Sequence, residues 1–168
     1  LNHYNISKIE YIKIDVESAD SLVLNDLLKN NIVAKNLSIE CQEPVVIELL
    51  LNSQYKSFKF FEGGDLTFKK NIEIMNKNDE KKLINFDLHS SGPYGDDIPG
   101  NYYSKNSILP YFLNNGLGWK DVHCLLEKKN NLHTIKYLPS IHSRGFRHHF
   151  KNILPSFIKA LKNRIGNK

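Results

Sequence analysis

Residues 9–16 read Ile-Glu-Tyr-Ile-Lys-Ile-Asp-Val, a run of β-branched and aromatic residues in which an acid stands next to last. Such a run is typical of a β-strand. The following segment, residues 18–30, carries leucines at helical spacing, has Ser18 or Asp20 placed to cap its start, and reaches two asparagines that would stop it. The chain therefore opens with a strand followed by a helix.

The same alternation continues along the chain. Residues 37–41 indicate a second strand, residues 44–52 a helix that begins at a proline, and residues 55–61 a third strand. Strands that alternate with helices over short connections predict an α/β fold, in which helices flank a parallel sheet joined by right-handed crossovers.

The second half of the chain is less regular. Residues 77–82 are expected to form a polar surface loop, and residues 88–100 hold too many glycines and prolines for regular structure. A helix is expected within residues 104–114, with a start near Pro110. Residues 119–126 predict a last strand.

Charge is spread unevenly over the 168 residues, a length that suits one domain. The net charge is +5, yet residues 128–168 contain ten Lys or Arg and no acid, so residues 1–127 carry −5. Within this basic tail, residues 151–168 gather apolar side chains on one face of an amphipathic helix. That helix is expected either to lie on an anionic membrane surface or to pack on the sheet. Nucleic-acid binding is disfavoured, because aromatic residues do not interleave with the basic ones.

The sharpest candidate for chemistry is the pair Asp15 and Glu17 at the end of the first strand. Carboxylates at i and i+2 of an extended backbone point the same way, into the crevice beyond the sheet where ligands of such folds bind. The alternative, which spacing alone favours, is that Asp15 caps the next helix while Glu17 faces solvent. Glu40 ends the second strand at the same edge, either to bind a ligand or as a plain polar terminus.

The last strand offers a second set of candidates. Trp119, Asp121 and His123 fall on one face, where Asp121 could orient the His123 imidazole; ordinary hydrogen bonds of partly exposed residues are the alternative that we favour. Trp119 is suited to stack on a sugar ring, although a strand Trp more often belongs to the core or its rim. The His-rich residues 141–149 are not expected to bind a metal, because adjacent histidines point apart and two arginines repel a cation. Cys41 and Cys124 are expected to be buried free thiols of an intracellular protein.

Four segments in order resemble FkbM-family methyltransferases. Residues 11–19, Tyr-Ile-Lys-Ile-Asp-Val-Glu-Ser-Ala, look like the family's Lys-Ile-Asp-Val-Glu-Gly-x-Glu motif, and residues 36–41 are similar to its next strand, which ends in Ile-Glu. Residues 91–100, Ser-Gly-Pro-Tyr-Gly-Asp-Asp-Ile-Pro-Gly, resemble a Ser-Gly-Pro-Phe-Gly-Glu-Asp loop of one branch, and residues 116–123 resemble its Gly-x-Gly-Trp-x-Asp-x-His segment. The chain departs from the pattern at Ser18 and Asp20, where the family usually has Gly and Glu.

The resemblance implies a Rossmann-like class I methyltransferase sheet with a final antiparallel strand, and S-adenosylmethionine-dependent O-methylation of a sugar or glycan hydroxyl. It implies that Asp15, with Glu17 beside it, positions the acceptor and takes its proton. The residues that it places against the acceptor are Glu40, Ser91 and Gly92 (in a loop that is either a lid or a simple connection), Trp119 and His123.

In this family a strand and a glycine-rich loop ahead of the Asp-containing strand hold the cofactor. Eight residues precede Ile9, and no strand–Gly-x-Gly–helix unit surrounds Gly63-Gly64. We therefore expect residues 1–127 to be the C-terminal part of a methyltransferase domain, followed by the tail at residues 128–168. The alternative is a non-catalytic remnant that binds a partner or a glycan. The expected location is the cytoplasm, with the tail as a peripheral contact to the inner membrane face.

Overall fold

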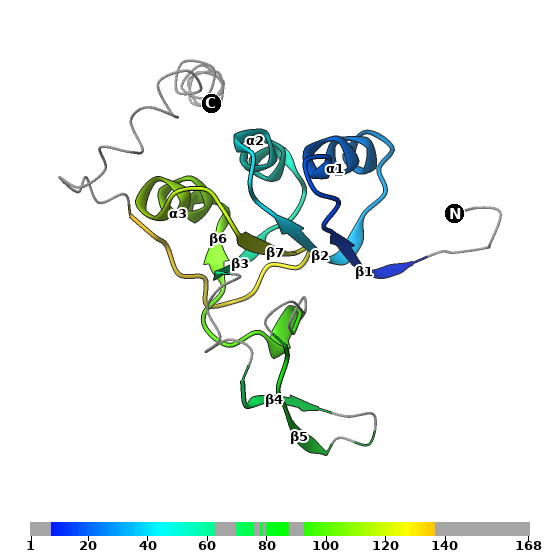
Figure 1. The fold of residues 1–168 in the computed structure, drawn as a ribbon, viewed down its shortest axis with the longest axis vertical. Helices are drawn as coiled ribbons and strands as arrows, with labels where there is room; N and C mark the ends of the chain where they lie inside the picture. Colours follow the sequence, from blue (N-terminus) through cyan, green and yellow to red (C-terminus); the bar gives the residue numbers. More distant parts are fainter. Residues whose placement is uncertain (1–7, 63–69, 76–77, 79, 88–92, 137–168) are drawn as a thin grey trace.

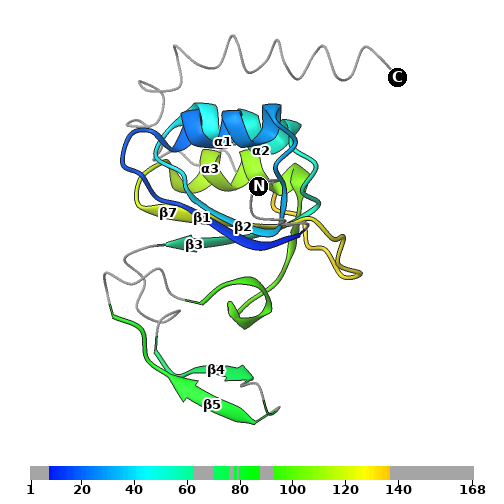
Figure 2. The same cartoon turned by 90° about the vertical axis from the view of Figure 1, so that its right-hand side faces the viewer.

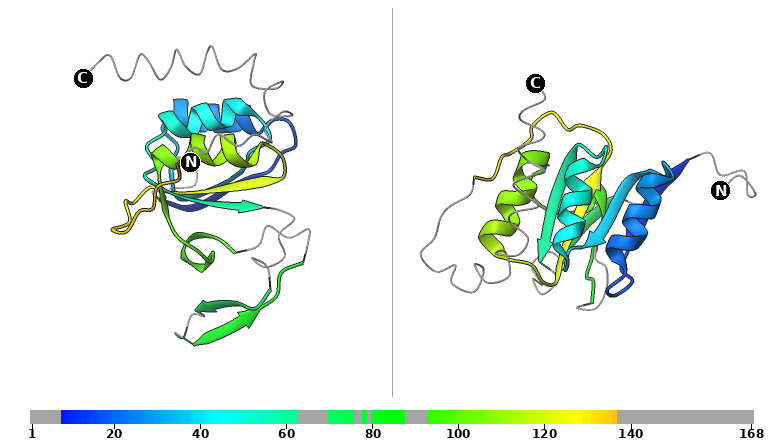
Figure 3. Two further views of the ribbon diagram at one scale, coloured as in Figure 1. Left: turned by 90° about the vertical axis from the view of Figure 1, so that its left-hand side faces the viewer. Right: turned by 90° about the horizontal axis from the view of Figure 1, so that it is seen from above.

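A computed structural model describes residues 8–62, 70–75, 78, 80–87 and 93–136. Its centre is a five-stranded sheet with three helices side by side on one face: α1 (Asp20–Lys29), α2 (Pro44–Asn52) and α3 (Ile108–Asn115) (Figure 1; Figure 3, right). A two-stranded hairpin of β4 (Ile72–Met75) and β5 (Lys81–Ile84) projects on the other side of the sheet (Figure 2). The described residues thus form a mixed α/β structure.

The sheet is mixed rather than wholly parallel. Its strand order is β1 (Ile9–Ile14), β2 (Ala34–Glu40), β7 (Lys120–Leu125), β3 (Ser57–Glu62) and β6 (Tyr103–Ser104). β1 and β2 are parallel, whereas β7 is antiparallel to both β2 and β3. The first three strands therefore run in one direction, as predicted, and the antiparallel strand expected at residues 119–126 is confirmed as β7. Its place between β2 and β3 was not part of the prediction.

The helix-facing side of the sheet forms the hydrophobic core. Side chains alternate between the two faces of a strand, so one set from each strand meets the helices. That set includes Ile14, Leu37, Ile39, Phe58, Val122 and Cys124, which cluster with Leu24, Val46, Ile47, Leu50, Ile108 and Phe112 from the helical side. Phe60 of β3 stacks on Tyr111 of α3 with ring centroids 4.1 Å apart. The opposite face of the sheet is left to the alternate, mostly polar residues.

Several sequence predictions are confirmed. α2 begins at Pro44 and ends at Asn52, and α3 carries Pro110 in its first turn, near the expected start. Cys41 and Cys124 are buried and free. The prediction of a surface loop at residues 77–82 is wrong at its end, because Lys81 and Lys82 begin β5 and pair with β4.

The predicted cap of α1 is also wrong. The N-cap residue is Ala19, which makes no side-chain capping bond. Asp20 lies inside the helix, where its Oδ1 accepts a hydrogen bond from the backbone N–H of Val16 at 3.2 Å. The Asp20 carboxylate thus stabilises the turn that precedes α1 and does not cap the helix.

Residues 127–136 pack on the body of the fold. Ser57 Oγ donates to the carbonyl of Glu127 (2.8 Å) and accepts from the N–H of Lys129 (2.9 Å), and the N–H of His133 bonds the carbonyl of Tyr102 (2.8 Å). The amphipathic helix expected at residues 151–168 and the His-rich residues 141–149 lie outside the described residues. Among the helices that the structure describes, none has the length and apolar character to cross a membrane.

Candidate functional site

Four charged residues meet where β1 and β2 end. Asp15 follows β1, Glu40 closes β2, and Asp121 pairs with Glu40 from the first part of the antiparallel β7. Lys13 Nζ lies 3.2 Å from Asp121 Oδ2 and 3.5 Å from Asp15 Oδ2. We call Lys13, Asp15, Glu40 and Asp121 the carboxyl-edge cluster, since it occupies the edge at which ligands of open α/β sheets bind.

Lys13 is the cation of the cluster. Partial burial would by itself lower its pKa, but the charge and hydrogen bond of Asp121 and the charge of Asp15 outweigh burial and raise the pKa of Lys13. The ammonium therefore stays charged and compensates two of the three carboxylates.

Glu40 is the carboxylate that the cluster leaves least compensated. Its residue is 7% exposed, and burial raises the pKa of its carboxyl, as do the charges of Asp15, Asp121 and Asp20, although a hydrogen bond to Gln42 opposes this. A carboxyl with a raised pKa is a stronger base and a better proton acceptor at neutral pH than an ordinary one. The surroundings of Glu40 thus suit proton transfer.

The turn after β1 does not place Asp15 and Glu17 as expected. Glu17 and Ser18 have φ of 44° and 65°, so the backbone is left-handed there and the strand alternation ends before Glu17. Both acids are exposed. The prediction that they point the same way from extended backbone loses its basis, and so does the alternative that Asp15 caps α1, because Ala19 is the N-cap residue.

The sheet face opposite the helices carries a row of polar side chains that are largely buried. Lys13, Ser38, His123 and Lys59 are register partners across β1, β2, β7 and β3. His123 is 5% exposed, and burial lowers its pKa to about 3, with Lys13 and Lys59 adding to the effect. Its two ring nitrogens make no hydrogen bond in the part of the chain that the structure describes.

Asp121 therefore does not orient His123. The two residues share a strand face, as predicted, but the Asp121 carboxylate accepts a hydrogen bond from Lys13 Nζ instead. The alternative of partly exposed residues with ordinary hydrogen bonds is also wrong, since Asp121 is 6% exposed and His123 is as buried.

Residues 94–102, which we call the cover segment, lie over this polar row. Tyr94 stacks on Tyr11 of β1 with ring centroids 4.4 Å apart, and Lys59 Nζ donates to the carbonyls of Gly95 and Ile98. η3 (Gly95–Asp97) places Asp96 where it accepts from Tyr102 Oη (2.9 Å) and pairs with Lys129 Nζ (3.0 Å). These two partners hold the pKa of the Asp96 carboxyl below its usual value although partial burial opposes them.

The cover segment requires a glycine at position 95. Its φ is +61°, and a Cβ there would stand 3.3 Å from Asn36 Oδ1 on β2. The preceding residues Ser91 and Gly92, expected to contact an acceptor, lie outside the described residues.

Trp119 lies at the same edge as the carboxyl-edge cluster. It precedes β7 rather than belonging to it, and it is 47% exposed. Beside it, Lys120 pairs with Glu62 at 2.9 Å. An exposed aromatic ring offers a surface that suits the apolar face of a sugar.

Two further site residues are Lys59 and Lys13, and only the first has a local signal in the sequence. Lys59 interrupts the apolar run Ser-Phe-Lys-Phe-Phe of β3, and a charge inside a buried strand usually has a specific partner. Lys13 belongs to the family-like motif. Its hydrogen bond to Asp121 joins residues 108 positions apart, so no local pattern indicates it.

No group of three or more His, Cys, Asp or Glu residues suited to hold a metal occurs within the described ranges. Comparison of the sequence with protein-family models and curated proteins, and of the structure with solved structures, finds no match.

Proposed function

We propose that this protein is an S-adenosylmethionine-dependent O-methyltransferase and that residues 8–136 form the acceptor side of a Rossmann-like domain. The observation that carries the proposal is the carboxyl-edge cluster, in which the buried Glu40 has a raised pKa at the edge where such sheets bind ligands. The family-like motif at residues 11–19 passes through the same cluster, and β7 supplies the final antiparallel strand that the resemblance implies.

The described residues fit the acceptor better than the cofactor. S-adenosylmethionine supplies a methyl group on a positively charged sulfur, and its nucleotide needs a cradle of close backbone. No strand–Gly-x-Gly–helix unit occurs in the part of the chain that the structure describes. There, β1 pairs with β2 alone, and its outer edge has no strand partner. We propose that cofactor-binding strands pair at this edge, and we assign no cofactor contact to the residues described.

Within this proposal the chain's own residues divide the work at the acceptor. Glu40 takes the proton of the acceptor hydroxyl, because burial and neighbouring acids raise the pKa of its carboxyl. Asp15, exposed and held by Lys13, accepts a hydrogen bond from the acceptor and fixes its direction of approach. Glu17 stands one residue beyond Val16 on the left-handed turn and contributes negative charge rather than direct contact.

The proposed acceptor class is a sugar or glycan hydroxyl. The exposed ring of Trp119 offers a stacking surface for a sugar face, and the carboxylates of the carboxyl-edge cluster offer acceptors for its hydroxyls. Peripheral contact of residues 151–168 with an anionic membrane, where lipid-linked glycans are found, remains a proposal of the same account.

The test is methyl transfer by the full-length protein. Purified protein is incubated with methyl-labelled S-adenosylmethionine and a set of methyl glycosides and oligosaccharides, and label in base-stable methyl ethers is counted. Label that appears in ethers supports the proposal. Absence of transfer together with absence of measurable S-adenosylmethionine binding would instead support the non-catalytic reading, in which the surviving edge binds a glycan or a partner.

A further inference from the structure

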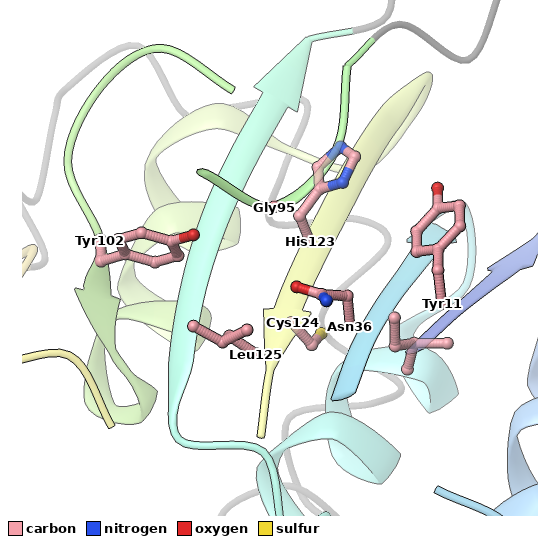
Figure 4. A pocket seen from close by; sticks show the side chains of 8 residues that line it. Tyr11, Asn36, Gly95, Tyr102, His123, Cys124 and Leu125 are labelled. Carbon is pink, nitrogen blue, oxygen red and sulfur yellow. The ribbon is translucent and has the colours of Figure 1, made fainter. Parts of the chain in front are cut away.

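The two faces of the sheet differ in how they are covered. On the polar face, the cover segment leaves a cavity of ≈ 10 Å³ beside His123, which is about the room that one water needs (Figure 4). On the other face, the three helices cover the sheet, but apolar side chains of α1 and α2 stay exposed to solvent. An uncovered apolar surface is thus found on the helices rather than under the cover segment.

Three large apolar side chains form what we call the helix-face patch: Leu22 (69% exposed) and Val23 (37%) on α1, and Val45 (51%) on α2. They are three of the seven large hydrophobic residues that are exposed within the described ranges. Ser21 Oγ donates to Glu43 Oε2 at 2.6 Å, so the first turns of α1 and α2, which carry the patch, are neighbours (Figure 3, right). Single exposed hydrophobic residues are common, whereas neighbouring ones mark contact surfaces.

Acidic side chains stand one turn beyond the patch. Asp26 follows Leu22 by four positions and Glu48 follows Val45 by three, so each acid lies on the same side of its helix as the apolar residue. Both acids are exposed, and Lys29 is the one basic residue of the two helices. A partner that fits this surface therefore combines apolar side chains with positive charge.

Residues 151–168 of the chain have this combination. They contain five Lys or Arg and no Asp or Glu. Their apolar residues recur at helical spacing, at Leu154, Phe157, Ile158, Leu161 and Ile165. The charge and the apolar pattern of this segment are thus complementary to those of the helix-face patch and its acids.

The described chain ends within reach of the patch. The carbonyl of Lys136 accepts a hydrogen bond from Asn114 Nδ2 at 3.0 Å, near the end of α3. α3 leads into β7, whose start pairs with the ends of β2 and β3, and α1 and α2 begin at that same end of the sheet. Residues 137–150 can span up to about 45 Å. α1 lies two helix spacings from α3, which is about 20 Å (Figure 3, right).

We infer that residues 151–168 bind the helix-face patch of the same molecule. Their apolar side chains cover the patch, and their basic side chains are attracted by Asp26 and Glu48. One apolar face cannot bind two partners at once, so contact of this segment with a membrane requires its release from the patch. The inference rests on this surface and on the sequence of the tail, and it does not require methyl transfer.

Protection of the tail from trypsin tests the inference in the full-length protein. Trypsin cuts after Lys159, Lys162 and Arg164 when the segment is free to enter the protease, and mass spectrometry locates the cuts. Leu22→Asp should speed these cuts by about fivefold or more, because it places a charge in the apolar contact. The matched control is Leu83→Asp on the hairpin, at a leucine that is 66% exposed, and its tail should be cut as slowly as that of the parent.

A second variant tests the contact from the side of the tail. Phe157→Asp should speed cleavage after Lys162 and Arg164 as Leu22→Asp does. The double variant should show less than the product of the two single increases, because both substitutions remove the same contact. Increases that multiply in full would show that the two residues act independently and would overturn the inference.

The other possible occupants of the tail are distinguished in the same assay. Equal cleavage of the parent, Leu22→Asp and Leu83→Asp would show that the patch does not hold the tail. Protection that is lost when the protein is diluted would assign the tail to the patch of a second copy. Protection that requires vesicles of equal parts phosphatidylcholine and phosphatidylglycerol would assign the tail to the membrane. Each of these results would overturn the inference.

Discussion

The buried His123 makes the stability of the protein depend on acid in a predictable way. Its pKa falls from 6.5 to about 3 in the folded state, first because burial disfavours the charged ring and then because Lys13 and Lys59 repel it. A group whose folded pKa is depressed contributes its full stability above the unfolded pKa and loses it as the pH falls toward the folded pKa. The window here runs from about 6.5 down to about 3.

The size of the effect follows from that shift. The unfolded chain binds a proton at His123 below about pH 6.5 and the folded protein does not, so lowering the pH from about 7.5 to about 5 should cost roughly 2 kcal/mol of unfolding free energy. The full cost, reached below the folded pKa, is roughly 4 to 5 kcal/mol. The charged groups that act on the ring are Lys13 and Lys59, and both disfavour the charged imidazole.

The assay is urea unfolding of the parent and of His123→Leu at both pH values. Leucine has a similar size, does not titrate, and removes the two unbonded nitrogens. On acidification, the unfolding free energy of the variant should therefore fall by roughly 2 kcal/mol less than that of the parent. His133→Gln, at an exposed histidine, is the matched control and should behave as the parent does. Equal acid sensitivity of parent and His123→Leu would refute the reasoning, because the titrating group would then lie elsewhere.

Two further predictions concern the turn after β1 and the cation of the edge. Ser18→Gly should raise the unfolding free energy by about 0.5 to 1 kcal/mol in urea unfolding, because the φ of 65° strains a serine and not a glycine. Asn31→Gly is the control: its φ is 54°, but asparagine tolerates this region, so its unfolding free energy should rise by less. An equal or larger rise at Asn31 would contradict this reasoning. Lys13→Met should lower the unfolding free energy by about 1 to 3 kcal/mol, because it removes the cation beside the buried Asp121. Lys81→Met breaks the exposed pair with Glu73 and should have a clearly smaller effect; equal effects would show that the buried pair contributes no more than the exposed one.

The local pattern of the sequence predicts the elements better than it predicts their assembly. The proline at residue 44 is a local signal that predicts a helix to about Asn52, and α2 occupies these residues. The place of β7 between β2 and β3 is a pairing between distant segments, and alternation of strands and helices does not encode it.

The candidate site was predicted in part for the same reason. Asp15 and Glu40 were placed at one edge correctly, since each follows or ends a strand of the same direction. The direction of the Glu17 side chain is not predicted correctly. Glu17 and Ser18 both have left-handed backbone although neither is a glycine or an asparagine, so the sequence gives no sign of this turn. The burial of His123 depends on segments distant in the sequence. The local sequence around a strand histidine therefore does not show whether it is exposed or buried.

The central claim is that methyl transfer takes place at the carboxyl-edge cluster with Glu40 as the base. The most direct measurement compares turnover and S-adenosylmethionine affinity of the full-length protein with those of Glu40→Gln, using Glu73→Gln on the hairpin as the matched control. We expect Glu40→Gln to lower turnover by about 100-fold or more, with cofactor affinity changed by less than about threefold, and the control to be unaffected. Unchanged turnover in Glu40→Gln would contradict the claim and remove the carboxyl-edge cluster from the reaction.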